Sequence, residues 1–418
     1  MRQPKTISSG AAEVVASGNC SGCGLCSLLD PSLEMTLDRQ GFSRPKSIGS
    51  ASIAKGDAAY DAFSYGCPGR QVISPREDRP ERDSLFGSFH SVWEAWANDE
   101  ETRHAGSSGG TITALAAWLV ETGRVAQVTG VQAKPERPSR TIPVTIGTRA
   151  GLMKSAGSRY APVSALDNPN VFLPGSAVVG KPCEASAIRV ASDLLLPEAD
   201  RPIILSFFCA GVPSQLATDS LVRSFGLDPE SLASMRYRGD GWPGDFVATD
   251  HVGETGRMPY DESWGKVLGP TMQWRCKICV DGVGESADIV AGDFWRSDER
   301  GYPIFDDGNG ISVLIARTAR GHQIIAEARS GGVLTASALD ITKLYSVQPF
   351  QVERRQTLFG RLLGARLAGT RVPHYIGFRL LALGLSRPYR RLIRPTLGSF
   401  VRTRRRRRRP LSGKRENT

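Results

Sequence analysis

The sequence lacks the apolar segments that mark membrane-spanning and secreted proteins. No run in its 418 residues approaches the roughly 18 consecutive apolar residues needed to cross a bilayer. The first segment, MRQPKTISSGAAEVVASGN, has no apolar core of the kind found in secretory signals. We therefore expect a cytoplasmic protein. Thiols stay reduced in the cytoplasm, so the eight cysteines indicate metal or redox chemistry rather than a disulfide framework.

Acidic residues are almost absent from the last part of the chain. Residues 351–418 contain 19 Lys and Arg residues but only Glu353 and Glu416, while the whole chain has a formal net charge of +11. The preceding residues are thus net acidic, which disfavours a basic nucleic-acid groove. The tail ends in RTRRRRRRP (402–410), and we expect one or two short helices and a partly disordered basic end. Its charge suits a membrane surface or an acidic partner, with a nucleic-acid arm as the less favoured alternative.

The distribution of apolar residues predicts an α/β fold. Residues 1–80 are rich in Gly, Ser, Pro and Cys, which is typical of a small module folded around a metal centre rather than around an apolar core. PREDRPERDS (75–84) has the composition of a charged linker. Beyond it, strand-like segments alternate with helical ones, which predicts a mostly parallel or mixed sheet flanked by helices. The expected segments are a strand at 91–97, a helix at 111–123, strand–helix pairs at 176–192 and 202–225, and strands at 287–294 and 311–317.

Three cysteines near the N-terminus follow one another at two-residue gaps. Cys20, Cys23 and Cys26 match the beginning of the C-x2-C-x2-C-x3-C-P run of bacterial ferredoxins, whereas zinc sites usually use separated pairs. The fourth cysteine of that run precedes a proline, and only Cys67, in YGCPGR, does so here. Closing the longer loop to Cys67 adds little entropic cost. We predict one 4Fe-4S cluster on these four thiols, with a structural zinc or an incomplete site as the alternative.

The remaining cysteines suggest a second site. Cys183 comes two residues after AVVG and Cys209 directly follows IILSFF, so both should leave the carboxyl edge of a parallel sheet, where ligands bind. Cys276 and Cys279, in RCKICVDG, form a two-thiolate loop just before an expected strand. The four thiols could close a second cluster site. A zinc knuckle on Cys276 and Cys279, with the other two as buried apolar residues, is the alternative.

Two Gly-Ser turns are candidate anion sites. GSSGG (106–110) comes directly before a helix, whose N-terminal N–H groups attract a pyrophosphate or the electron-rich edge of a reduced flavin. Ser107 or Ser108 could instead serve only as a helix N-cap. The turn also matches the G-x-S-x-G elbow of serine hydrolases, but the preceding NDEETRHA is too polar for the buried strand that an elbow requires. GSRY (157–160) places a cation where it could meet a phosphate or a flavin ring, unless Arg159 is a surface residue and Tyr160 a core one.

Seven segments, in this order, resemble the coenzyme F420 hydrogenase/dehydrogenase beta-subunit family, which includes hydroxymethyl-chlorophyll reductase of plants. They are CSGCGLC, AGSSGGTITALAAWLVETG, SAGSRYAPV, VVGKPCEASAIR, LSFFCAGVPS, YRGDGWPGDF and RCKICVDGVGESADIVAGDFW, spread over about residues 18–317. The resemblance implies FAD and a 4Fe-4S cluster on the Pro-Cys, Phe-Cys and Cys-x-x-Cys motifs, and a further cluster in the N-terminal segment. Arg159 and Lys181 depart from the lysine and threonine that are common at these positions.

The motifs and the resemblance together predict FAD and two 4Fe-4S clusters as cofactors. The expected units are a ferredoxin-like iron–sulfur module (1–80), a flavin-binding part (85–170), a part with the second cluster (171–350) and a basic tail (351–418). The expected cluster ligands are Cys20, Cys23, Cys26, Cys67, Cys183, Cys209, Cys276 and Cys279. The expected flavin site consists of Ser107, Ser108, Gly109, Gly110, Gly157, Ser158, Arg159, Tyr160, Lys181 and Asp293, with Trp295 beside the last.

The expected function is that of an iron–sulfur flavoprotein oxidoreductase. Electrons would pass from a ferredoxin-like donor through both clusters to FAD and on to a small organic substrate, or in the reverse direction. None of the five histidines lies in a motif that identifies a proton donor, so no catalytic residue is assigned. Two other classes stay open: a non-enzymatic electron-transfer subunit of a larger redox complex, and an iron–sulfur regulator that binds nucleic acid through the tail.

Overall fold

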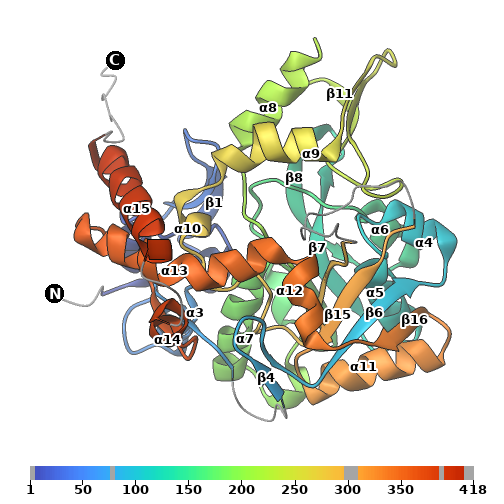
Figure 1. The fold of residues 1–418 in the computed structure, drawn as a ribbon, viewed down its shortest axis with the longest axis horizontal. Coiled ribbons are helices and arrows are strands. Elements are labelled where there is room, and N and C mark those ends of the chain that lie inside the picture. The colour runs from blue at the N-terminus through green and yellow to red at the C-terminus, as the bar shows by residue number, and fades with distance from the viewer. Residues whose placement is uncertain (1–4, 76–80, 296–308, 386–389, 409–418) are drawn as a thin grey trace.

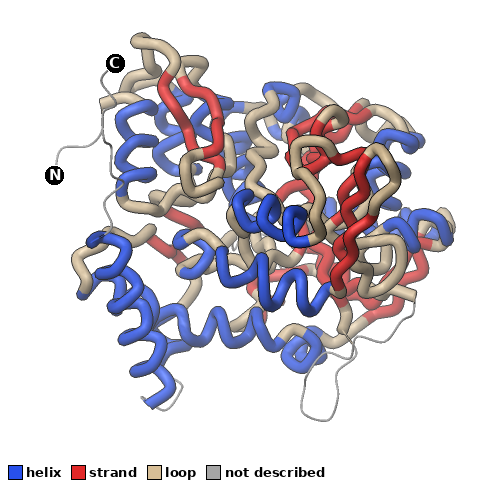
Figure 2. Tube along the Cα trace, turned by 90° about the horizontal axis from the view of Figure 1, so that it is seen from above, coloured by secondary structure: helices blue, strands red, loops and turns tan. Residues whose placement is uncertain are grey.

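A mixed eight-stranded sheet forms the centre of the protein (Figures 1 and 2). The computed structural model describes residues 5–75, 81–295, 309–385 and 390–408. Three neighbouring strand pairs are parallel and the other four are antiparallel, which confirms the predicted α/β fold in its mixed form. The strand order across the sheet is β16 (Leu334–Ala338), β6 (Ser91–Ala97), β15 (Ser312–Ala316), β14 (Ile289–Asp293), β10 (Ile203–Phe207), β9 (Ser176–Gly180), β7 (Gln127–Lys134) and β8 (Arg137–Ile146).

Helices cover both faces of this sheet. On one face, Leu115 and Ile325 pack against the strands in a core that includes Leu205, and on the other face Ile188 packs in a core that includes Ile204. Adjacent residues of one strand therefore serve opposite cores, as expected for a strand that is buried on both sides. The covering helices are α5 (Thr111–Glu121), α6 (Arg149–Lys154) and α11 (Ala319–Ser330) on the first face, and α7 (Pro182–Leu195) on the second.

The N-terminal module shares its apolar core with the sheet. Ile7, Leu25 and Phe63 are almost completely buried in the same core as Ile188 of α7. The prediction of a module without an apolar core is therefore wrong, because the apolar side chains of the module pack together with those of α7 in one core. Its elements are α1 (Ile7–Ala16), α2 (Leu25–Leu29), β1 (Leu33–Leu37), β2 (Ser43–Ser47), α3 (Ala58–Gly66) and β3 (Gln71–Ile73).

A small lobe follows β10 and has a core of its own. Leu221, Tyr237 and Phe246 are buried in this core, and Tyr160 packs on it from outside the lobe. The lobe consists of α8 (Gln215–Ser224), the antiparallel strands β11 (Leu232–Arg236), β12 (Phe246–Asp250) and β13 (Thr255–Met258), and the short helix α9 (Tyr260–Glu262).

The C-terminal segment is largely part of the folded body. Arg354, Arg355 and Leu358 are buried, and β17 pairs in parallel with β3 of the N-terminal module. The prediction of a basic tail with one or two short helices over residues 351–418 therefore missed a packed helix of 19 residues, which Figure 1 shows crossing the molecule as α13. The elements are α12 (Leu344–Val347), α13 (Pro349–Leu367), β17 (His374–Ile376), α14 (Leu380–Leu385) and α15 (Arg390–Arg408).

The remaining elements are short. Half of the predicted linker, residues 76–80, lies outside the described residues, and Glu81–Asp83 form β4, which pairs with β5 (Gly87–Phe89). Helix α4 (Glu100–Ala105) directly precedes the GSSGG turn. Helix α10 (Trp274–Lys277) contains Cys276, the first thiol of the Cys-x-x-Cys loop. In the parts of the chain that the structure describes, none of the helices combines the length and the apolar character needed to cross a membrane.

Candidate functional site

The segments that carry the predicted ligands leave the sheet at one edge. β9 and β10 are parallel neighbours, so Cys183 and Cys209, which follow them, emerge on the same side. β14 runs parallel to β10. β6 runs in the same direction as β14, because both strands pair antiparallel with β15. The GSSGG turn, which follows β6 and α4, therefore belongs to this edge as well.

The first cysteine group comprises Cys20, Cys23, Cys26 and Cys67. Burial raises the pKa of Cys23 to about 11 and that of Cys67 to about 12, and the thiol of Cys20 adds to both shifts. Burial and then the other three thiols hold the pKa of Cys26 well above its usual value. The structure thus brings Cys67, at the C-terminal end of α3, to the CSGCGLC loop.

The second cysteine group comprises Cys183, Cys209, Cys276 and Cys279. Burial, then the thiol of Cys276 and more weakly that of Cys279, raise the pKa of Cys209 to about 12. Cys183 lies in the first turn of α7, and Cys209 contributes to its raised pKa, after burial and Glu184. The backbone N–H of Val212 points at the sulfur of Cys276, 3.4 Å away. The two loops and the two strand ends therefore meet as the spacing predicted.

The donor set of both groups is made only of thiols. All eight cysteines are free, and none is exposed. A thiolate in such surroundings requires a neighbouring positive charge, which bound iron would provide. Among the described residues, no three side chains of His, Cys, Asp or Glu lie close enough together to hold a single metal ion. Cubane thiolates bind four separate irons and so stand farther apart than the ligands of one ion.

The two cysteine groups are neighbours. The thiol of Cys23 contributes to the raised pKa of Cys183, after burial and Glu184. Gln273 donates from Nε2 to the carbonyl of Ser21, 3.0 Å away, so the segment before Cys276 rests on the CSGCGLC loop. The α10 segment therefore holds the second cysteine group against the first.

The two Gly-Ser turns also meet. The hydroxyls of Ser107 and Ser158 are 2.7 Å apart. Ser108 accepts a hydrogen bond from Ser312, and Gly109 donates its N–H to Ser312, each at 2.9 Å. The hydroxyl of Ser108 is thus held by β15, whereas that of Ser107 lies where the two turns touch.

The first turn is neither a serine N-cap nor a nucleophile elbow. The N-cap of α5 is Gly110, with φ +68° and no side-chain cap, so the alternative role of Ser107 or Ser108 as a cap is wrong. A methyl group on Gly110 would lie 2.6 Å from the carbonyl oxygen of Thr102, which explains the glycine. Because α4 separates β6 from the turn, no buried strand runs directly into Ser108 as an elbow requires.

Arg159 and Tyr160 are occupied by contacts within the fold. Arg159 donates from Nε to Thr141 and from Nη2 to the carbonyl of Pro138, both at 2.8 Å, and from Nη1 to the carbonyl of Met235 at 3.2 Å. Its guanidinium therefore ties β8 to β11. The ring of Tyr160 packs 4.8 Å from that of Trp264 in the small lobe.

A different arginine lies beside the turns. Arg238 is 2% exposed, and a methyl group on Gly157 would lie 2.8 Å from its carbonyl oxygen. Its Nη1 donates to Oδ2 of Asp293 at 2.8 Å, and its Nε donates to the carbonyl of Pro243 at 2.6 Å. Its Nη2 is buried and has no hydrogen-bond partner among the described residues. One N–H arm of a buried cation is therefore left to bind something else.

Three aromatic rings surround this guanidinium and, with it and Asp293, form what we call the Arg238 cage. The ring centroids of Trp242, Tyr260 and Trp295 lie 4.8, 4.7 and 5.0 Å from the guanidinium carbon. Although burial opposes the charge, Asp293 raises the pKa of Arg238, so the group stays cationic. Asp293 and Trp295, both predicted at this edge, contact Arg238, which lies beside the second turn. Arg238 was not among the site residues predicted from the sequence.

Lys181 belongs with the second cysteine group rather than with the turns. Its Nζ donates to the carbonyl of Val163 at 2.9 Å and forms an ion pair with Glu184 at 2.5 Å. Burial lowers its pKa, but Glu184 and then the thiols of Cys183 and Cys209 raise it by more. Lys181 is therefore a buried positive charge beside these thiols.

One face of α13 connects the Arg238 cage with the second cysteine group. Gln348, directly before α13, donates to the carbonyl of Asp293. Arg354 donates from Nη1 to the carbonyl of Cys209, 3.0 Å away. Charge patterning gave no signal for this role, because it assigned Arg354 to the basic tail. Arg238, in contrast, lies in the glycine-rich YRGDGWPGDF segment, where Gly239, Gly241 and Gly244 all have positive φ.

Comparisons with known proteins identify the family of this chain. Family models match residues 92–168 (coenzyme F420 hydrogenase/dehydrogenase, beta subunit N-term) and 175–342 (the C terminus of the same subunit), together more than half of the chain. The chain therefore belongs to the coenzyme F420 hydrogenase/dehydrogenase beta-subunit family, whose members are redox subunits.

Individual relatives are distant. The coenzyme F420-dependent sulfite reductase of Methanocaldococcus jannaschii is 24% identical over 331 residues, which are 75% of this chain and 46% of that protein. This chain thus spans about half the length of that relative. The coenzyme F420 hydrogenase subunit beta of Methanothermobacter thermautotrophicus is 25% identical, over 62% of this chain and 88% of that subunit. A chain of the F420-reducing [NiFe] hydrogenase complex of Methanosarcina barkeri gives a TM-score of 0.48 at 21% identity, covering 66% of this chain and 96% of that one.

Proposed function

We propose that this chain is an iron–sulfur flavoprotein oxidoreductase that relays electrons between a ferredoxin-like donor and a small organic substrate. The observation that carries the proposal is the convergence of eight free, unexposed thiols in two adjoining groups of four, beside a pair of joined Gly-Ser turns. Thiols grouped in fours are the ligand set of iron–sulfur clusters. The family membership supports an oxidoreductase role.

Each cysteine group would hold one 4Fe-4S cluster, which when bound accepts and releases single electrons. Cys20, Cys23, Cys26 and Cys67 would hold one, and Cys183, Cys209, Cys276 and Cys279 the other. The buried cations Lys181 and Arg354 lie beside the second cysteine group, where they would offset the negative charge of thiolates. The apolar core around the first cysteine group excludes water from it.

The Gly-Ser turns and the Arg238 cage would hold FAD, which when bound collects electron pairs for transfer to an organic molecule. The free N–H groups at the start of α5 suit a pyrophosphate or the flavin edge. Arg238, rather than the predicted Arg159, is the cation that we assign to the flavin N1–C2=O region, because its Nη2 is unpartnered among the described residues while Arg159 is held by backbone carbonyls. Ser107 and Ser158 would contribute hydroxyl groups at the junction of the turns.

The proposed electron donor is a ferredoxin-like protein, and the first proposed organic partner is coenzyme F420. A ferredoxin-like protein suits the N-terminal module, which brings the first cysteine group near the second. Several matched relatives are named for coenzyme F420, so this deazaflavin is the first organic partner to test. In the alternative, the chain is an electron-transfer subunit that delivers electrons to another protein of a larger redox complex.

A reduction experiment tests the proposal. Under anaerobic conditions, reduced ferredoxin is expected to bleach the flavin absorbance of the parent protein, and Cys67→Ser is expected to slow this step at least about tenfold. The reason is that the substitution removes the proposed entry point but leaves the turns intact. Direct chemical reduction of the flavin by dithionite serves as the control and should be equally complete in both proteins. Equal rates with ferredoxin would contradict the proposed route.

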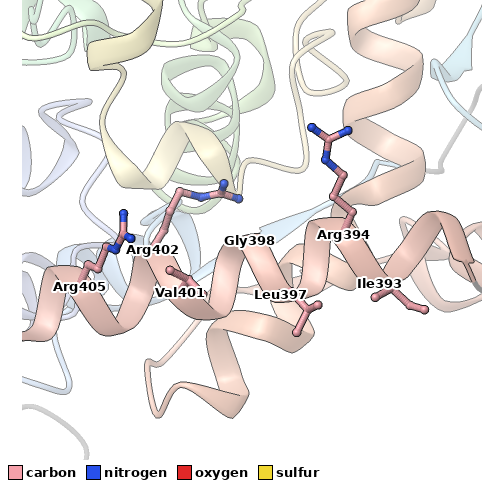
Figure 3. A pocket seen from close by; sticks show the side chains of 7 residues that line it. All are labelled: Ile393, Arg394, Leu397, Gly398, Val401, Arg402 and Arg405. Carbon is pink, nitrogen blue, oxygen red and sulfur yellow. The ribbon is translucent and has the colours of Figure 1, made fainter.

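We also propose that the outer face of α15 binds an anionic membrane surface. Ile393, Leu397 and Val401 are spaced four residues apart and are 49%, 58% and 44% exposed, so they form an apolar stripe open to solvent. Arg394, Arg402 and Arg405 flank this stripe along the helix. Figure 3 shows Ile393 and Leu397 on the side of the helix opposite Arg394 and Arg402. An apolar stripe flanked by arginines is typical of helices that lie in the membrane interface.

Vesicle binding tests this assignment. Leu397→Glu is expected to weaken binding to phosphatidylserine-containing vesicles at least about tenfold, because a charge replaces the centre of the stripe. Leu194→Glu is the matched control, since Leu194 is 51% exposed on α7, away from this stripe. Binding should also fall as salt rises. If both variants bind like the parent, α15 does not contact lipid.

A further inference from the structure

Arg275 links the two cysteine groups, because it precedes a thiol of the second group in the chain and its side chain reaches the backbone of the first. Its own position in α10 places it directly before Cys276 of the second cysteine group. Its Nη2 donates to the carbonyl of Pro68, 2.9 Å away, and Pro68 directly follows Cys67 of the first cysteine group. Figure 1 shows α10 between the N-terminal segments and the C-terminal helices. One side chain thus spans the junction of the two groups.

The guanidinium of Arg275 is buried, and not all of its N–H donors are hydrogen-bonded within the described residues. Arg275 is 2% exposed, and its Nε has no hydrogen-bond partner among the described residues. Its guanidinium carbon lies 5.7 Å from the centre of the Tyr375 ring, which covers one side of it. Arginine cannot lose its proton in a protein, so a full positive charge with a free N–H is fixed at this place. Leaving a buried donor unpaired is costly unless a bound group accepts from it.

The other cations near the thiols serve one group each. The charge of Arg70 lowers the pKa of Cys67 in the first cysteine group, against the larger effect of burial. Arg354 donates to the carbonyl of Cys209 in the second cysteine group. Arg275 is therefore distinguished by its position between both groups, where two negatively charged centres would otherwise repel each other across a low-dielectric interior.

We propose that Arg275 is a shared positioning residue, whose charge would offset both proposed clusters at once and whose free Nε–H would be available to a sulfur atom of a bound cluster. This inference rests on the proposed function. Positive charge and hydrogen bonds to sulfur make a cluster easier to reduce. A single cation between the two centres would raise both reduction potentials together and keep them close, so that an electron can pass between them in either direction.

Redox titration monitored by electron paramagnetic resonance tests the proposal. The potential of each cluster is assigned in the Cys67→Ser and Cys209→Ser backgrounds, which each keep one cluster. Arg275→Gln is expected to lower both potentials, so that the ratio of reduced to oxidised cluster at a fixed potential falls on the order of tenfold at each centre. Arg275→Lys, which keeps the charge, is expected to restore most of the shift.

Two control variants show whether the effect is shared. Arg70→Gln is expected to shift only the N-terminal cluster, and Arg354→Gln only the second one. The proposal is overturned if Arg275→Gln keeps both clusters and shifts neither potential or only one. If Arg275→Gln loses a cluster, the Arg275→Lys variant decides. Parental potentials in Arg275→Lys support the proposal, and a ratio of reduced to oxidised cluster that falls about tenfold at each centre overturns it. If the parent protein contains no iron, the proposed function itself is wrong, and not only the role of Arg275.

Discussion

Replacing Cys209 by serine is expected to remove about four iron atoms and four sulfide ions per chain while leaving the N-terminal cluster in place. Cys209 follows β10 at the sheet edge, and the thiols of Cys276 and Cys279 contribute to its raised pKa after burial. Serine is a much poorer iron ligand than a thiolate, because its hydroxyl does not ionise at neutral pH. Iron and sulfide analysis of anaerobically purified protein measures the loss.

Cys67→Ser is the matched control for this variant. It is expected to lose the same amount of iron from the other cluster, and the double variant should lose nearly all of it. The two single variants should therefore retain electron paramagnetic resonance signals that differ from each other and together reproduce the parent. If Cys209→Ser keeps all of its iron, or if zinc replaces iron in the parent, the assignment of two four-cysteine cluster sites is wrong.

Arg238→Gln is expected to reduce flavin retention by on the order of tenfold or more, because a hydrogen bond from a charged group contributes about 1.5–3 kcal/mol. The free Nη2 of Arg238 is the one arm of this guanidinium that the fold leaves unpartnered within its described residues. Glutamine removes the charge and keeps an amide donor, so the loss of affinity reports the contribution of the charge. Flavin content and the flavin dissociation constant, measured after gentle dialysis, give the result.

Arg159→Gln is the control that separates the two arginines. Its guanidinium is held by β8 and β11, so the substitution should lower the free energy of unfolding by about 1–3 kcal/mol while the folded protein keeps its flavin. Thermal melting and flavin content are measured on both variants. The reverse outcome, with flavin lost from Arg159→Gln and retained by Arg238→Gln, would return the cation role to Arg159.

The alternation of short apolar strands with helical segments was enough to predict the central fold. Strand–helix pairs at 176–192 and 202–225 correspond to β9 with α7 and β10 with α8. Cys183 and Cys209 share a sheet edge for a reason visible in the sequence, since each follows an apolar strand within three residues. The long reach of Cys67 to the CSGCGLC loop was likewise predictable from its Cys-Pro context.

The contacts that depend on packing between distant segments were not predictable. Composition alone described the N-terminal module as poor in apolar residues, but Phe63 and Leu25 complete a core whose other half belongs to α7. Charge counting treated Arg354 as part of a solvated tail, although α13 places it against Cys209. Arg159 lies two residues after Gly157 and Arg238 lies directly before Gly239, so the sequence did not show which guanidinium would be fully bound within the fold.

The most direct test of the central claim is the cofactor content of the parent protein after anaerobic purification. If one chain carries two 4Fe-4S clusters and one flavin, as we propose, the purified protein will contain about eight iron atoms and eight acid-labile sulfides per chain, together with about one FAD. Zinc in place of iron, or folded protein purified without flavin and unable to bind FAD, would contradict it.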